Sequence, residues 1–101
     1  MGQRELDKSI IPNNDEYCYL CKQNGLYVKG TDSHHMLFGN KKAYADTDGL
    51  ICQLCHSHHM RLHQQQEHQL ELKQLAERVW LEHYDKTIEE WIERYGKNYL
   101  D

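Results

Sequence analysis

The sequence lacks any apolar run long enough to cross a membrane, and it shows no signal peptide. It also lacks an excess of positive charge, since 12 lysines and arginines stand against 16 aspartates and glutamates. The net charge of −4 therefore does not by itself indicate nucleic-acid binding. The apolar fraction of 39% in 101 residues is low and limits the core to a modest size. These features predict a single cytoplasmic domain with no membrane partner.

The acidic excess is confined to the C-terminal part of the chain. Residues 1–66 carry seven basic and seven acidic side chains, whereas residues 67–101 carry five and nine. No internal repeat or linker is visible. We predict a polar N-terminal arm over residues 1–16, which docks through Ile10 and Ile11, and one domain over residues 17–101.

The four cysteines form two Cys-x-x-Cys pairs, a spacing that suits metal binding better than a disulfide framework. The pairs can contribute to one tetrahedral zinc site, and a histidine that follows the second pair can replace one thiolate. The candidates for this site are Cys18, Cys21, Cys52, Cys55, His58 and, less strongly, His56. A redox role for the pairs is a further alternative.

The histidines predict a second metal site. His59 and His63 are four residues apart, so on a helix both rings share one face and can bind one ion. His34 can supply a third ligand from outside that helix. His35 would point to the other side of an extended backbone, which leaves it free to act as a general base.

The remaining pattern predicts a small set of strands and helices. We expect a strand over residues 50–55 and a short strand-like run over residues 26–28. An apolar stripe at helical spacing predicts a helix over residues 64–83, with the stripe in the core. A capping box predicts a last helix over residues 87–95.

Lys41 and Lys42 form the only adjacent pair of basic residues in the chain. Such a pair is more often solvated surface than a binding site. Beside a metal site, however, two lysines can attract the phosphates of a nucleic acid. We therefore predict that Lys41 and Lys42 contact nucleic acid.

Together these motifs resemble the HNH endonucleases of the ββα-metal superfamily. The likeness is greatest to the small phage-encoded type that includes RecA-dependent recombination-enhancing nucleases. It covers roughly residues 8–100 and is carried by Cys18-x-x-Cys21, His34-His35, Gly49-Leu50, Leu54-Cys55-x-x-His58-His59 and His63, with a similar tail at Tyr95-Gly96-Lys97-Asn98-Tyr99-Leu100.

The resemblance implies an α+β fold with a small ββα-metal core, a zinc knuckle and two C-terminal helices. It implies that Cys18, Cys21, Cys55 and His58 hold structural zinc and that Cys52 is spare. It also implies a catalytic ion on His34, His59 and His63, with His35 as the general base. The family's middle asparagine, which helps to hold the loop of the base, is absent from residues 46–50. Either an aspartate or the backbone replaces it there, or the base is less well oriented.

The resemblance further implies a metal-dependent DNA endonuclease that hydrolyses phosphodiester bonds. Its cofactors would be structural Zn²⁺ and one catalytic divalent metal, among Zn²⁺, Ni²⁺, Mn²⁺ and Mg²⁺. Histidine ligands suit the first three better than Mg²⁺. The implied partners are DNA and a recombination or phage DNA-processing protein in the cytoplasm of a bacterial host. The alternative is a noncatalytic zinc-knuckle module that binds nucleic acid or a protein.

Overall fold

Two short antiparallel strands, β1 (Asp32–His35) and β2 (Ile51–Leu54), lie at the centre of the fold. The computed structural model describes residues 8–100, and the hairpin is the sheet found within them. The register pairs His34 with Cys52 and His35 with Ile51. All of β2 is buried, which confirms the expected strand within residues 50–55. The fold is α+β, as expected.

A 3-10 turn, η1 (Gly39–Lys41), and helix α3 (Lys42–Asp48) connect the two strands. The helix ends at Gly49, which has a φ of 78° that favours glycine. A Cβ at Gly49 would collide with the backbone oxygen of Lys8, because the N-terminal segment passes close by. The amide of Ile10 donates to the Gly49 carbonyl over 2.9 Å, and Ile11 is buried. The expected docking of the arm through these isoleucines is confirmed; residues 1–7 lie outside the described part.

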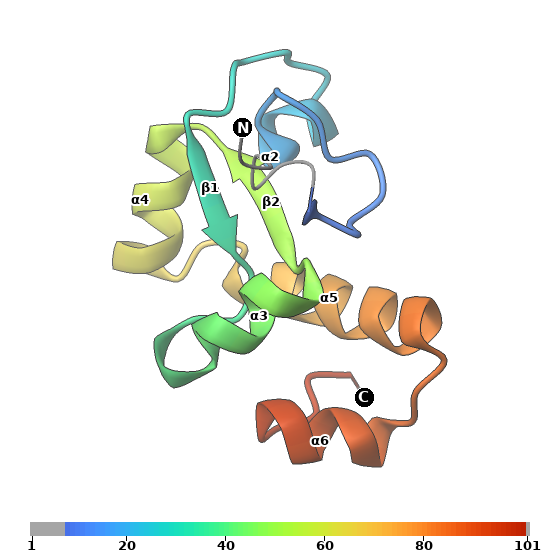
Figure 1. The fold of residues 1–101 in the computed structure, drawn as a ribbon. Coiled ribbons are helices and arrows are strands. Elements are labelled where there is room, and N and C mark those ends of the chain that lie inside the picture. The colour runs from blue at the N-terminus through green and yellow to red at the C-terminus, as the bar shows by residue number, and fades with distance from the viewer. Residues whose placement is uncertain (1–7, 101) are drawn as a thin grey trace.

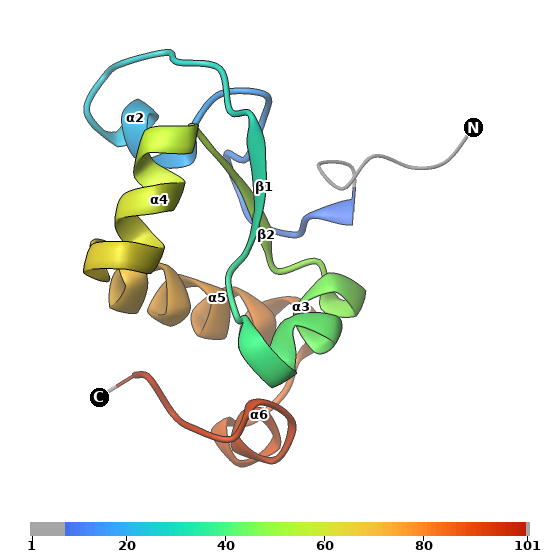
Figure 2. The ribbon, with the colours of Figure 1, turned by 90° about the vertical axis from the view of Figure 1, so that its left-hand side faces the viewer.

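Five α-helices are present within residues 8–100. Helix α2 (Tyr19–Gln23) follows the first cysteine, and α4 (His56–Gln65) follows β2 and lies alongside the hairpin (Figure 2). Helix α5 (Gln69–Tyr84) passes below the hairpin, and α6 (Ile88–Tyr95) lies below α5 (Figure 1). No helix of the described residues has the length and apolarity needed to span a membrane.

Two sequence-based predictions of secondary structure were wrong. The helix expected over residues 64–83 is broken, because Gln66 and His68 adopt left-handed conformations with φ of 58° and 63°. The glutamines at its start therefore end α4, and α5 begins only at Gln69. The run over residues 26–28 is an exposed loop that no sheet covers, and the nearby backbone bridge joins Tyr17 to Lys29.

The last helix forms as predicted, with both hydrogen bonds of the Thr87–Glu90 capping box. The apolar stripe of α5 is also confirmed as core, since Leu72, Ala76 and Trp80 are buried. Its last member, His83, is exposed instead.

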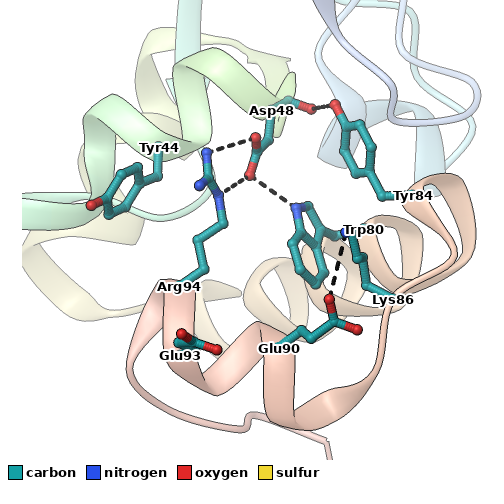
Figure 3. Close-up of a pocket in the computed structure, with 8 residues that line it drawn as sticks. All are labelled: Tyr44, Asp48, Trp80, Tyr84, Lys86, Glu90, Glu93 and Arg94. Atoms are coloured by element: carbon teal, nitrogen blue, oxygen red, sulfur yellow. Dashed lines mark hydrogen bonds and ion pairs between the residues drawn. The ribbon is translucent and has the colours of Figure 1, made fainter.

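The carboxylate of Asp48 joins α3 to the two C-terminal helices (Figure 3). It accepts hydrogen bonds from Trp80 Nε1 (2.9 Å) and from the hydroxyl of Tyr95 (2.5 Å). Arg94 donates to both carboxylate oxygens, from Nε over 2.6 Å and from Nη2 over 2.9 Å. A buried carboxylate needs such partners, and the bidentate arginine supplies the opposite charge. Asp48 is therefore a structural residue that positions α5 and α6.

Candidate metal centres

The first cluster of possible metal ligands lies between α2 and the start of α4. It consists of Cys18, Cys21, Cys55 and His58, whose ligand atoms all lie within 4.8 Å of one another. The Nδ1 atom of His58 is 3.4 Å from the sulfur of each of the three cysteines, and the sulfurs of Cys21 and Cys55 are 3.9 Å apart. These four residues sit close enough to hold one metal ion.

The spacing of these ligand atoms fits zinc. In a tetrahedral site with Zn–S bonds of about 2.3 Å and Zn–N bonds of about 2.1 Å, neighbouring ligand atoms lie roughly 3.5–3.8 Å apart. The observed S···N separation of 3.4 Å and S···S separation of 3.9 Å lie just outside the two ends of this range. Three cysteines with one histidine are a recognised structural zinc set. The four ligands close the coordination shell, which is compatible with a structural zinc.

The thiols of Cys21 and Cys18 differ in how readily they ionise. Burial, followed by the neighbouring thiols of Cys18 and Cys55, raises the pKa of Cys21 to about 12. Burial also opposes ionisation of Cys18, but hydrogen bonds from the backbone amides of Cys55 and Cys21 outweigh it and lower the pKa of Cys18. A thiolate is thus favoured at Cys18 and disfavoured at Cys21. A divalent ion reverses this balance, because it stabilises every thiolate that it binds.

The two competing ligands lie outside this cluster. Cys52 is fully buried in β2 opposite His34, and burial raises the pKa of its thiol. His56 is exposed and contacts the carboxylate of Asp32 at 3.3 Å. Among the described residues the structure therefore groups His58 with the three cysteines, and it leaves Cys52 as a core residue.

The second cluster lies where α4 faces β1. It consists of His34, His59 and His63, again with ligand atoms within 4.8 Å of one another. The Nε2 atoms of His59 and His63 are 3.2 Å apart. Two nitrogens bound to one ion at about 2.1 Å lie roughly 3.0–3.4 Å apart in octahedral or tetrahedral geometry. The pair on α4 therefore has the spacing of two ligands of one ion, as the i, i+4 spacing predicts.

Asp32 orients the first of these helical histidines. Its Oδ2 lies 2.8 Å from Nδ1 of His59, and the hydrogen bond from His59 is the main cause that lowers the pKa of Asp32. A carboxylate can only accept, so Nδ1 carries the proton and Nε2 presents its lone pair toward His63. Carboxylate–histidine pairs of this kind hold metal ligands in place. The sequence argument missed Asp32, whose position two residues before His34 was its only signal.

His34 is kept neutral by its surroundings. It is 2% exposed, and burial is the main reason that its pKa falls to about 3, with the nearby His59 and His63 as further causes. The ring of Phe38 lies 6.0 Å from His34 and 4.9 Å from His63, centroid to centroid. A neutral imidazole is the form that binds metal. The cluster offers three imidazole ligands, so an ion bound here keeps open coordination positions.

His35 points away from this cluster, as the alternation along an extended strand predicts. Its Nε2 lies 3.1 Å from Oδ1 of Asp46, whose other oxygen accepts from Lys8 over 3.0 Å. Hydrogen bonding from His35, then from Lys8, lowers the pKa of Asp46, which is therefore a carboxylate at neutral pH. The proton on His35 must then sit on Nε2, and Nδ1 is free to accept another. Asp46 occupies the region where the family asparagine was expected.

The two lysines predicted to contact nucleic acid lie on different sides of one turn. Lys42 lines a shallow pocket together with His35 and Asp46. Lys41 lies over the ring of Tyr44, with its Nζ 5.5 Å from the ring centroid. The structure thus places Lys42, but not Lys41, beside the candidate base.

No family model matches this chain, and no curated protein or solved structure matches it either. Any functional assignment therefore rests on the residues and their geometry.

Proposed function

We propose that this protein is a metal-dependent DNA endonuclease with an HNH core formed by β1, β2 and α4. The observation that carries the proposal is the division of the His34–His35 pair at the end of one strand. His34 joins a three-histidine cluster, whereas His35 is paired with Asp46. A ligand and an oriented base next to each other in the chain are what metal-assisted hydrolysis of a phosphodiester requires.

The residues have separate tasks in this reaction. Nδ1 of His35 accepts a proton from the attacking water, while Asp46 holds Nε2–H and stabilises the imidazolium that forms. The water oxygen bonds to phosphorus, and the bond to the 3′ oxygen breaks. Lys42, in the same pocket as His35, attracts the phosphate.

His34, His59 and His63 would hold the divalent ion. Such an ion supplies a Lewis acid that stabilises charge on the phosphate and on the leaving oxygen. The donor set fits this role, because three imidazole ligands leave coordination positions for both oxygens. Zn²⁺, Ni²⁺ and Mn²⁺ suit these nitrogen ligands better than Mg²⁺ does.

The decisive experiment compares the wild type with His35→Ala on plasmid and single-stranded DNA, with each divalent ion in turn. We expect the variant to bind DNA normally and to cleave it about 10²–10⁴-fold more slowly, the usual contribution of a positioned base. His83→Ala, a change of an exposed histidine on α5, is the matched control and should cleave like the wild type.

His34→Ala should fail in a different way from His35→Ala. Loss of a ligand weakens binding of the ion, so excess metal should restore part of the cleavage. Cleavage at the wild-type rate in His35→Ala would refute the proposed base. If the wild type binds DNA but cleaves it with none of the ions, the protein is a noncatalytic zinc-knuckle module that binds nucleic acid.

A further inference from the structure

Two lysines outside the proposed catalytic residues are held against aromatic rings. The Nζ atom of Lys73, on α5, lies 4.6 Å from the ring centroid of Phe38 and 5.3 Å from that of Tyr99. The Nζ atom of Lys97, a residue that follows α6, lies 5.7 Å from the ring centroid of the same Tyr99. We refer to Lys73 and Lys97 as the lysine pair. Contacts of this kind position an ammonium group without neutralising it.

The charges of the lysine pair are free of carboxylate partners within residues 8–100. Other lysines of the same range, such as Lys22 and Lys86, form ion pairs with carboxylates at 2.8 and 3.5 Å. Burial, and then the charge of Lys97, lowers the pKa of Lys73. The two cations repel each other on a partly dehydrated surface, and binding of an anionic ligand would reduce this repulsion.

The lysine pair is continuous with the three-histidine cluster. Phe38, which carries Lys73 on its ring, contacts the ring of His63 at a centroid distance of 4.9 Å. Lys73 is also one of the charges that lower the pKa of His34, although burial and the nearer histidines contribute more. A ligand that reaches from the histidine cluster across Phe38 therefore meets Lys73 first.

The position of Lys97 depends on the segment after α6, which turns back toward α5 (Figure 1). The amide of Tyr99 donates to Glu77 over 2.7 Å, and its carbonyl accepts from Gln74 over 3.0 Å. Both partners belong to α5, so the segment is fixed to the helix that carries Lys73. The lysine pair is thus a built feature of the fold.

We propose that Lys73 and Lys97 bind the phosphodiester backbone of the DNA strand beside the bond that is cut. The proposal rests on the endonuclease function above and names the surface that carries the flanking strand. Successive phosphates supply a row of anions, which matches two spaced ammonium groups better than a single small anion does. Lys41 lies close to Gly96, the residue before Lys97, since a Cβ at Gly96 would lie 3.9 Å from its side chain.

The test measures binding of a fluorescent single-stranded oligonucleotide by anisotropy over a range of salt concentrations. All proteins carry His35→Ala, so that cleavage does not interfere. Lys73→Met and Lys97→Met keep the apolar stems, and each should weaken binding about fivefold at 0.1 M salt. The slope of log affinity against log salt concentration should become smaller in magnitude by about 0.7 for each lysine removed. This is the value for one phosphate contact on a single strand. Lys73→Arg should bind like the parent.

The matched control is Lys29→Met, which removes a lysine whose side chain is 75% exposed and lies 3.9 Å from Glu16. It should change neither the affinity nor the slope. Circular dichroism checks that every variant is folded. Parental affinity and slope in the double variant Lys73→Met/Lys97→Met would overturn the lysine pair and leave the endonuclease proposal intact. A parent that does not bind the oligonucleotide overturns the lysine pair, and the endonuclease proposal then stands or falls separately on wild-type cleavage.

Discussion

The two clusters of possible metal ligands use the same helix in opposite ways. The cysteine cluster takes His58 from the first turn of α4 and closes a set of four ligands, with Cys18 fully buried. The histidine cluster takes His59 and His63 from the next positions and leaves a set of three, of which His63 is exposed. A closed tetrahedral set holds structural zinc, whereas an open set leaves room for a substrate. Adjacent residues of α4, His58 and His59, thus belong to a closed set of ligands and to an open one.

The strongest way to break this comparison is to remove a cysteine ligand. Cys18→Ala should abolish zinc binding at the cysteine cluster and unfold much of the domain. The reason is that structural zinc contributes about 10–16 kcal/mol of apparent binding free energy in small metal-dependent folds. Metal content and far-UV circular dichroism measure the effect.

Two controls separate the clusters. His63→Ala should keep the structural zinc and the fold but lose cleavage. Cys52→Ser changes a buried cysteine outside the cluster and should keep the zinc as well. An unchanged fold and zinc content in Cys18→Ala would contradict a structural role for the cysteine cluster.

Trp80→Ala tests whether the domain also depends on the helices that lie away from both clusters. Trp80 is 4% exposed and packs edge-to-face against Trp91 with ring centroids 5.4 Å apart. We expect a loss of about 3–5 kcal/mol of unfolding free energy, because a large cavity replaces a buried ring. Thermal and denaturant melts measure this, and Leu70→Ala, at a position 57% exposed on the same helix, is the control. A melt like that of the wild type would show that α5 does not dock.

Asp32→Ala sharpens the comparison, because it should affect only the histidine cluster. Loss of the hydrogen bond to His59 should weaken binding of the second ion about 10–100-fold and leave the structural zinc in place. Isothermal titration with Ni²⁺ or Mn²⁺ measures the affinity, and excess metal should restore cleavage. Asp15→Ala, which removes a surface carboxylate paired with Lys22, is the control. Equal affinities in Asp32→Ala and the wild type would show that Asp32 does not orient the ligand.

The smallest effect concerns a buried acid outside both clusters. Burial raises the pKa of Glu77 above its ordinary value, although hydrogen bonds from the Tyr99 and Leu100 amides oppose this. The folded state therefore prefers the protonated acid, so the contribution of Glu77 to stability is greatest below about pH 4.5 and is lost as the pH rises through the raised pKa. Glu77→Gln should be more stable than the wild type at pH 7 by on the order of 1 kcal/mol, because an unpaired buried charge is removed. The difference should vanish in melts below about pH 4.5; a constant difference at every pH would exclude this cause.

Local spacing was enough to predict the ligand pairs within each cluster, because short separations along a chain translate into geometry. It left the fourth ligand of the cysteine cluster open, and only the family resemblance favoured His58 over Cys52. The i, i+4 spacing on a helix brings His59 and His63 to 3.2 Å, and the strand alternation sends His34 and His35 to different sides. The capping box placed the last helix for the same reason. These are interactions between neighbours in sequence, and no tertiary contact is needed to foresee them.

The tertiary structure alone decided which residues support the clusters. Asp32 and Asp46 became partners of His59 and His35 only through the pairing of β1 and the packing of α3 and α4. The break at Gln66 and the turn of the tail onto Glu77 likewise depend on where α5 packs. The type of a residue such as a carboxylate or a lysine does not tell which groups will lie beside it on the surface, so its role is set by residues distant in sequence. The fold places Lys73 and Lys97, for example, against the same ring of Tyr99.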